Sequence, residues 1–112
     1  MNYKEEILKQ YPHLLRRDGR FWGLECGEGW HQLIYEFFQE IEPLVKDSAD
    51  FTVLQIKQKF GTLRIYTNHD VLVQDALHRA EKKAAETCEI CGDKASTIEQ
   101  PWGAIRCGIH AK

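Results

Sequence analysis

The pattern that most constrains this chain is a repeated spacing of cysteine and histidine near its C-terminal end. Two residues separate Cys88 from Cys91, and two residues separate Cys107 from His110. Thiolate and imidazole groups in paired C-x-x-C and C-x-x-H spacings are typical ligands at the four tetrahedral corners of a structural zinc site. Because four protein ligands leave no corner for water, we expect a closed Cys3His site that holds structural Zn²⁺.

The alternative use of these cysteines is a disulfide. The chain begins Met-Asn-Tyr-Lys-Glu-Glu without the apolar run of a secretory signal, and no stretch reaches transmembrane length. We therefore expect a cytoplasmic protein without membrane contacts, in which thiols stay reduced and bind metal. Gly92 directly follows Cys91, and a glycine with positive φ suits the sharp turn that such a ligand pair requires.

Length and composition predict one compact domain. The chain has 112 residues, of which 43% are hydrophobic and 11% aromatic, so it has enough apolar surface for a core. Its net charge of −2 disfavours a dedicated nucleic-acid-binding protein, which usually carries a basic excess. We divide this domain into an α+β body over residues 1–87 and a zinc-binding lobe over residues 88–112.

Hydrophobic periodicity predicts three helices, over residues 3–15, 30–46 and 70–86. A β-hairpin is expected over residues 51–67, where apolar and polar residues alternate. The predicted fold class is therefore α+β, with helices packed on one face of a small antiparallel β-hairpin or sheet. Because only two residues follow His110, we expect the zinc lobe to be ribbon-like or a truncated treble clef.

The hairpin has two distinct faces, because side chains alternate along both of its arms. The apolar face is expected to pack on the helices and holds Leu54, Ile56, Phe60, Leu63 and Ile65. The opposite face carries an amide, three cations and a phenol, namely Gln55, Lys57, Lys59, Arg64 and Tyr66. This polar face is the clearest candidate for a binding surface, although an ordinary solvated strand face has the same composition.

The segment Phe21–Trp30 combines three glycines with two tryptophans. It suggests a short extended piece followed by a tight glycine loop that leads into the middle helix. The free N–H groups of a helix start attract anions, but Glu25 and Glu28 would repel phosphate. The favoured interpretation is structural: Trp22 and Trp30 enter the core, and the glutamates stabilise the start of the helix.

Three segments together resemble a group of short proteins of bacteria and of their phages and prophages. The matching segments are Glu25-Cys26-Gly27-x-Gly29-Trp30, then Gln55-Ile56-Lys57-x-Lys59-Phe60-Gly61-x-Leu63-Arg64-x-Tyr66, and finally Cys88-x-x-Cys91-Gly92 with Cys107-x-x-His110. The resemblance covers residues 21–110 in the same order. It implies a shared fold with a C-terminal zinc lobe but does not point to any particular activity. The phage association implies a host-takeover or anti-defence protein that acts by binding.

These observations lead to two binding hypotheses. In the first, a small zinc-stabilised protein binds a protein partner through the cationic hairpin face and the adjacent glycine–tryptophan loop. The residues expected to contact the partner are Gln55, Lys57, Lys59, Arg64 and Tyr66 of the hairpin and Glu25 and Trp30 of the loop. In the second, the same cations and tyrosine hold a nucleic acid, a nucleotide or another anion.

An enzyme is not expected, because no familiar catalytic motif is present. A zinc deaminase requires His-x-Glu and Pro-Cys-x-x-Cys, whereas Thr87 precedes the first cysteine pair here and His-x-Glu does not occur. The remaining enzymatic alternative is a Cys26 nucleophile with His31 as its base, but the segment offers no third group to orient the histidine. Cys26 is better explained as a small buried residue.

Overall fold

The computed structural model describes residues 2–15, 24–48, 50–59 and 62–92 of the chain. In chain order, its helices and strands are α1 (Tyr3–Gln10), β1 (Leu24–Glu25), α2 (His31–Val45), β2 (Val53–Lys59), β3 (Thr62–Thr67) and α3 (Gln74–Ala85). Short 3-10 turns accompany the helices at Pro12–Leu14, Glu28–Trp30 and Asp70–Val73. None of the helices described here has both the length and the apolar character that crossing a membrane requires.

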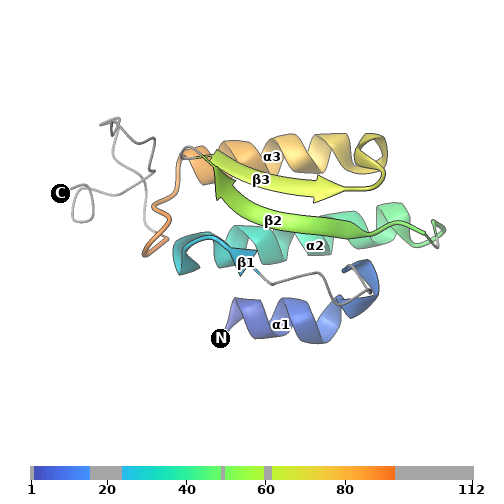
Figure 1. Cartoon of the computed structure of the whole chain (residues 1–112), viewed down its shortest axis with the longest axis horizontal. Helices are drawn as coiled ribbons and strands as arrows, with labels where there is room; N and C mark the ends of the chain where they lie inside the picture. The colour runs from blue at the N-terminus through green and yellow to red at the C-terminus, as the bar shows by residue number, and fades with distance from the viewer. Residues whose placement is uncertain (1, 16–23, 49, 60–61, 93–112) are drawn as a thin grey trace.

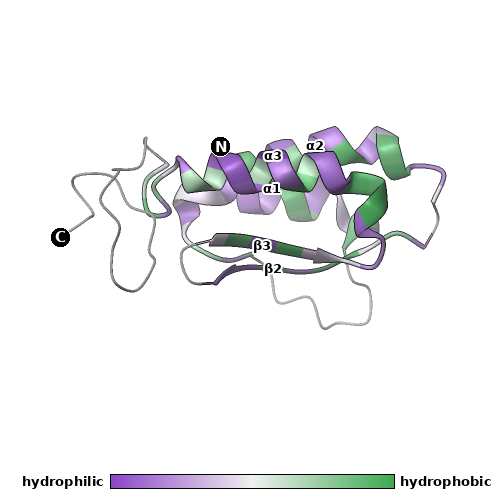
Figure 2. Ribbon diagram, turned by 90° about the horizontal axis from the view of Figure 1, so that it is seen from above, coloured by the Kyte–Doolittle hydropathy of each residue, from purple (hydrophilic) through white to green (hydrophobic). Residues whose placement is uncertain are grey.

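These elements form two layers. Figure 1 shows α2 between α1 and α3, and Figure 2 shows all three helices on the same face of the sheet. This arrangement confirms the predicted α+β class with helices on one face of a small sheet. The predicted zinc lobe stays a prediction, because residues 93–112 lie outside the described part of the chain.

The first predicted helix, residues 3–15, is divided in two. The side chain of Asn2 begins α1 by accepting a hydrogen bond from the backbone N–H of Glu5 at 3.1 Å. The helix ends before Pro12, because the ring of a proline disfavours helical backbone in the residue before it. The chain continues as the 3-10 turn Pro12–Leu14, in which Pro12 takes the first position and needs no N–H donor.

The sheet is mixed, with strand order β1-β2-β3. β2 and β3 form the predicted antiparallel hairpin, in which Ile56 lies opposite Ile65. β1 pairs in parallel with β2 and places Glu25 beside Lys57, so the prediction of a purely antiparallel sheet is wrong. Parallel strands require a crossover connection, and α2 supplies it between β1 and β2.

A β-bulge changes which residues of β2 face the helices. The register shifts between Val53 and Gln55, so Leu54 is an extra residue in the ladder. Val53 and Ile56 are fully buried and Leu54 is half-buried, whereas the sequence predicts Leu54 and Ile56 on a common apolar face. Phe60, predicted on that face too, lies outside the described residues. The alternation from Gln55 onward is regular, so the polar face of the hairpin is retained.

The core lies between the helices and the inner face of the sheet. The apolar stripe of α2 contributes the largest share, with Leu33, Ile34, Phe37, Phe38, Ile41 and Val45 buried. α3 adds a stripe of small residues, Ala76, Ala80 and Ala84, which allows it to approach α2 and β3 closely. The inner face of the sheet adds Val53, Ile56, Leu63 and Ile65. This packing fixes the orientation of the sheet, and therefore which side chains its outer face presents.

Candidate functional site

Residues 88–92, which we call the knuckle, form a tight turn just after α3. The backbone N–H of Gly92 donates to the carbonyl oxygen of Cys88 at 2.9 Å and closes the turn. Gly92 has a φ of 84°, the left-handed conformation that the sequence predicts for it. Cys88 is buried and Cys91 is exposed. The knuckle therefore has the reversal of direction that a C-x-x-C ligand pair requires.

The knuckle docks against residues 25–30, which we call the glycine loop. The backbone N–H of Gly29 donates to the carbonyl oxygen of Glu89 at 2.7 Å. The backbone N–H of Gly27 donates to the side-chain Oε2 of the same Glu89 at 2.8 Å. Glu89 thus accepts two hydrogen bonds from the glycine loop, one through its backbone and one through its carboxylate.

The close approach of the two segments explains why the loop contains glycine. A Cβ atom on Gly29 would lie 2.1 Å from the carbonyl oxygen of Cys88 and 2.5 Å from the nitrogen of Gly92. A Cβ atom on Gly27 would lie 2.3 Å from the carbonyl oxygen of Glu89. These neighbours are backbone atoms, which cannot rotate away as the end of a side chain can. The glycines are therefore required by the docking of the knuckle.

Trp30, the last residue of the glycine loop, holds the chain just before the knuckle. Its indole Nε1–H donates to the carbonyl oxygen of Thr87 at 2.9 Å, and its side chain is fully buried. The expectation that Trp30 contacts a partner is therefore wrong, because the ring has no exposed surface to offer. The described contacts support the structural interpretation of the loop for Trp30, while Trp22 lies outside the described residues.

The environment of Cys26 and His31 does not favour a nucleophile and its base. Burial, and then the nearby carboxylate of Glu89, raises the pKa of the Cys26 thiol to about 12, so the thiol stays protonated at neutral pH. The ring of His31 makes its hydrogen bond to the backbone of Cys26. Cys26 packs against the core but is only half-buried, so it is less buried than predicted from the sequence.

The described residues contain half of the predicted zinc site. Within the ranges that the structure describes, no three His, Cys, Asp or Glu side chains are grouped so as to hold a metal ion. Cys88 and Cys91 are the two described ligands of the predicted set. Cys107 and His110 lie outside the described residues, so the complete Cys3His site remains a prediction.

The outer face of the sheet carries the side chains predicted to bind a partner. Lys57 lies between Glu25 of β1 and Arg64 of β3 in one row across the three strands. In the neighbouring row, Gln55 lies opposite Tyr66, and the side-chain Nε2 of Gln55 donates to Oε2 of Glu25 at 3.0 Å. The structure thus brings these five residues, which come from two distant segments of the chain, onto one surface.

This outer face is polar but not uniformly cationic. Lys59 lies opposite Thr62 at the end of the hairpin and extends the surface in that direction. Tyr66 is 39% exposed, so part of its ring is accessible. Glu25 introduces a carboxylate directly beside Lys57, which the hairpin sequence alone did not reveal. We use the name outer face for Glu25, Gln55, Lys57, Lys59, Arg64 and Tyr66.

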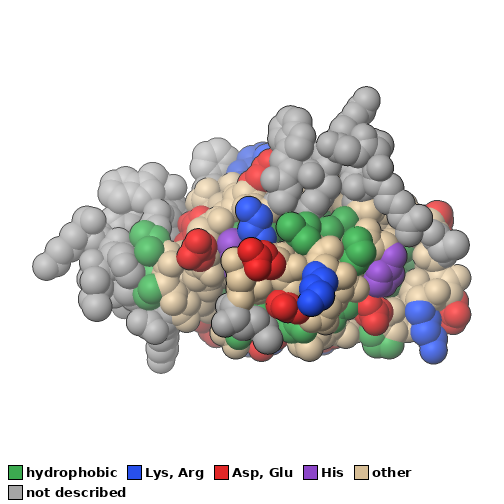
Figure 3. Space-filling model, turned by 90° about the horizontal axis from the view of Figure 1, so that it is seen from below, with side chains coloured by type: hydrophobic (Ala, Val, Ile, Leu, Met, Phe, Trp, Pro, Cys, Tyr) green, Lys and Arg blue, Asp and Glu red, His purple; other side chains and the backbone are tan. Residues whose placement is uncertain are grey.

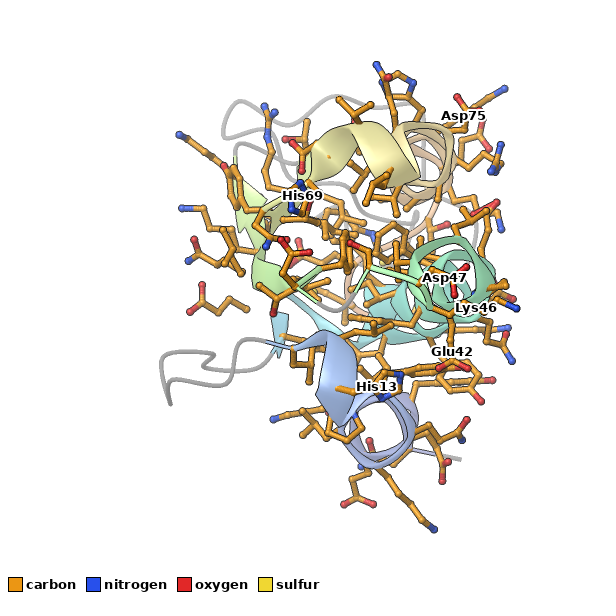
Figure 4. The ribbon with its side chains drawn as sticks, turned by 90° about the vertical axis from the view of Figure 1, so that its right-hand side faces the viewer. His13, Glu42, Lys46, Asp47, His69 and Asp75 are labelled. Carbon is orange, nitrogen blue, oxygen red and sulfur yellow. The ribbon has the colours of Figure 1, made fainter. Side chains whose placement is uncertain are left out.

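Two histidine–carboxylate pairs lie at the end of the molecule opposite the knuckle. Figure 4 shows His13, whose Nε2 lies 3.3 Å from Oε2 of Glu42 on α2. His69 lies 3.0 Å from Oδ2 of Asp50, and this hydrogen bond lowers the pKa of the Asp50 carboxyl. Exposed pairs of this kind contribute little free energy. We therefore assign them no role in binding.

Glu89 is the site residue that sequence reasoning missed. It stands between two predicted metal ligands, and no spacing rule distinguishes it from a solvated residue. Its hydrogen bond to Gly27 spans 62 residues, so its role follows only from the three-dimensional arrangement.

No protein-family model, curated protein or solved structure significantly matches this chain. A function for this chain is therefore inferred from the chemistry of the knuckle, the glycine loop and the outer face.

Proposed function

We propose that this chain is a small zinc-stabilised binding protein that contacts a protein partner through the outer face of its sheet. The observation that carries the proposal is the cross-strand row of Glu25, Lys57 and Arg64, extended by Gln55 and Tyr66. None of the described helices covers this face, because all three lie on the other side of the sheet (Figure 2). A rigid sheet therefore presents a fixed pattern of charges, an amide and an aromatic ring.

Zinc would act as a structural ion in this protein, held by Cys88, Cys91, Cys107 and His110. The reversal of the chain at Gly92 and the docking of the knuckle on the glycine loop support this role. A bound ion would fix the backbone groups that the loop contacts. Because the loop begins at β1, metal binding would also stabilise the edge of the sheet that carries Glu25.

The charge pattern of the outer face favours a protein partner over a nucleic acid. The carboxylate of Glu25 lies beside Lys57 and would repel a phosphate backbone. Arginine and tyrosine, represented here by Arg64 and Tyr66, are enriched at the energetically important positions of protein interfaces. The outer face carries charges of both signs. A protein surface with acidic and polar side chains would pair with it more readily than a uniformly negative phosphate backbone would.

The resemblance to small bacterial, phage and prophage proteins supports a role in the cytoplasm of a bacterial host. In this proposal the protein acts as a host-takeover or anti-defence factor by occupying the surface of a host protein. Its action then requires only binding, and no catalytic step is included.

The test replaces the three cations of the outer face together, as Lys57→Ala, Lys59→Ala and Arg64→Ala. A matched control replaces three exposed lysines away from the sheet, Lys9, Lys46 and Lys82, with alanine and removes the same charge. Each form is used as bait in a host lysate, and captured proteins are identified by mass spectrometry. We expect the first variant to lose the captured partner by more than about tenfold, as loss of charged contacts at an interface predicts, and the control to retain it.

The proposal fails if the outer-face variant remains folded and captures the same partner as the wild type does. The folded state of each variant is checked by circular dichroism before the capture.

A second candidate function is the binding of a nucleic acid or nucleotide by the same face. The proximity of Lys57, Arg64 and Tyr66 favours it, because two cations beside an aromatic ring suit a phosphate and a stacked base. Binding of labelled DNA, RNA and ATP at low salt distinguishes the candidates. Affinity that falls steeply with salt and is lost in the outer-face variant would favour this second function.

A further inference from the structure

Three large apolar side chains are exposed at the end of the molecule opposite the knuckle. Val71 is 85% exposed and Leu72 is 45% exposed in the 3-10 turn before α3, and Leu44 is 55% exposed near the end of α2. Single exposed apolar residues are ordinary on protein surfaces, whereas a group of them from neighbouring segments marks an interaction site. We use the name end patch for Leu44, Val71 and Leu72.

The pairing of α2 with α3 brings the residues of the end patch together. The two helices run antiparallel, and Glu40 of α2 pairs with Arg79 of α3. One turn further along α2, Leu44 therefore reaches the start of α3 beside Asp75. The 3-10 turn Asp70–Val73 leads directly into α3 and contacts both helices. The exposed residues of this turn therefore adjoin Leu44 and form one surface with it.

The turn that carries two of the three residues is held in place by the fold. Val73, its last residue, is buried in the core. The backbone N–H of Leu72 donates to the carbonyl oxygen of His69 at 3.2 Å and fixes the start of the turn. Val71 and Leu72 are therefore presented to solvent by an ordered turn whose own anchor faces inward.

Carboxylates lie next to the end patch. The segments 44–48 and 70–76 contain Asp47, Asp70 and Asp75 but only one cation, Lys46, and all four residues are exposed. Figure 4 looks onto this end and shows Asp47 at the end of α2 and Asp75 at the start of α3, both on the helical side of the molecule. The end patch is therefore an apolar surface with an acidic rim.

This acidic rim selects the kind of partner. The surface on the α1 side differs, because Figure 3 shows basic and acidic side chains interspersed there without a run of one sign. Carboxylates repel anionic lipid headgroups and the phosphates of nucleic acids. They attract lysine and arginine, so an apolar surface with an acidic rim matches a protein segment of opposite charge.

We propose that the end patch binds a protein segment in which apolar side chains are flanked by lysine or arginine. Its apolar side chains would cover Leu44, Val71 and Leu72, and its cations would lie against Asp47 and Asp75. An amphipathic helix presents such a pattern, because its apolar residues recur every three or four positions along one face. The end patch is separate from the outer face, so this inference goes beyond the proposed function.

Nuclear magnetic resonance of the full-length ¹⁵N-labelled protein tests this proposal. The probe is a synthetic amphipathic helix of leucine and lysine, and its counterpart has glutamate in place of lysine. The backbone amide resonances of the end patch are followed, with those of Leu8, an exposed leucine of α1, as the internal reference. The leucine–lysine peptide is expected to shift the end-patch resonances saturably. The leucine–glutamate peptide should bind there at least about tenfold more weakly, because its charges meet carboxylates.

An apolar variant and its control extend the test. Leu44→Ser combined with Val71→Ser removes two apolar contacts and should weaken binding of the leucine–lysine peptide by about tenfold or more, with the amide of Leu72 as the reporter. The matched control, Leu8→Ser, changes an exposed leucine elsewhere and should leave binding unchanged.

A charge variant tests the acidic rim. Asp47→Asn combined with Asp75→Asn should weaken binding of the leucine–lysine peptide by about fivefold at low salt and should remove most of its salt dependence. Glu5→Gln combined with Glu81→Gln removes the same charge at exposed positions away from the end patch and serves as the control.

The proposal is overturned if the leucine–lysine peptide does not move the end-patch resonances, or if the leucine–glutamate peptide binds there equally well. It is also overturned if the apolar variant binds the leucine–lysine peptide as the wild type does. Sedimentation of the protein alone tests the other occupant, a second copy of this chain. A dimer that the apolar variant loses would overturn the proposal, whereas a monomer at every concentration used supports it. These outcomes leave the proposed function unaffected, because the outer face is unchanged in each variant.

Discussion

Single residues decide whether the knuckle can dock on the glycine loop. Gly27 and Gly29 lie where a side chain would collide with backbone, and Gly92 takes a φ of 84°. The requirement for glycine therefore has two different origins, close approach at the first two positions and backbone conformation at the third. For both reasons, substitutions at these glycines should destabilise the fold more than substitutions at exposed positions nearby do.

Gly29→Ala is expected to destabilise the protein by about 3 kcal/mol, because its Cβ atom would force the knuckle away from the loop. The Cβ atom would lie 2.1 Å from the carbonyl oxygen of Cys88 and 2.5 Å from the nitrogen of Gly92. Urea unfolding of the wild type and of Gly29→Ala measures the difference in the free energy of unfolding. Gln32→Ala, at an exposed position of α2, serves as the control and should change stability by less than about 0.5 kcal/mol. Equal effects of the two substitutions would show that the loop and the knuckle do not dock as described.

His31 gives the protein a defined pH dependence. Burial lowers the pKa of its ring in the folded state below the ordinary value of 6.5, so the unfolded chain binds more protons in the interval between the two values. Stability should therefore fall as the pH decreases from 6.5 toward the folded-state value, and His31 should contribute no such dependence above that interval.

His31→Gln should remove this contribution and leave the effect of the metal ligands in place. The unfolding free energies of both proteins are measured in urea at about pH 7.5 and about pH 5.5. The variant should lose less stability on acidification than the wild type loses. Identical losses would mean that the imidazole of His31 is not held in its neutral form by the fold.

At the scale of elements, Trp30 connects the start of α2 to the end of α3. Trp30→Phe removes the Nε1–H donor to the carbonyl oxygen of Thr87 and leaves a gap in a fully buried position. We expect a loss of about 2 to 3 kcal/mol by urea unfolding. Tyr66→Phe, at a partly exposed aromatic position, should be nearly neutral. A neutral Trp30→Phe would indicate that the two helices are held together elsewhere.

The ion pairs between α2 and α3 should contribute far less than the packing of their apolar stripes. Arg79 pairs with Glu40, and Lys83 lies 3.7 Å from Glu36, with all four side chains substantially exposed. Glu40→Gln is therefore expected to lower the unfolding free energy by less than about 1 kcal/mol, since solvent screens such pairs. A loss comparable with that of Trp30→Phe would assign these pairs a larger structural role than their exposure allows.

The elements that the sequence predicts well are those whose patterns are local. The stripe of α2 and the alternation of the hairpin arms each define a face within one segment, so most of the core face and the hairpin residues of the outer face follow from them. The parallel pairing of β1 could not be predicted, because a strand of two residues has no alternation and its partner β2 lies beyond α2. The bulge at Leu54 was missed for a related reason, since an extra residue in one strand is defined only by its partner.

At the scale of the whole molecule, the knuckle is connected to the outer face through the glycine loop and β1. Glu89 contacts the glycine loop, the loop is continuous with β1, and β1 places Glu25 in the row with Lys57 and Arg64. A metal ion at the knuckle would therefore order the edge of the binding surface as well as the chain around its ligands. In the proposed function, removal of the metal should therefore weaken partner binding, although Cys88 and Cys91 do not belong to the outer face.

The most direct test of this account is the metal content of the purified protein and of two cysteine variants. Elemental analysis by mass spectrometry should find one Zn²⁺ per chain in the wild type and in Cys26→Ser, because Cys26 is not a ligand of the predicted site. Cys91→Ser, which changes an exposed side chain of the knuckle, should lose the ion. A folded wild-type protein without zinc, or a Cys26→Ser variant that loses its zinc, would contradict the central claim.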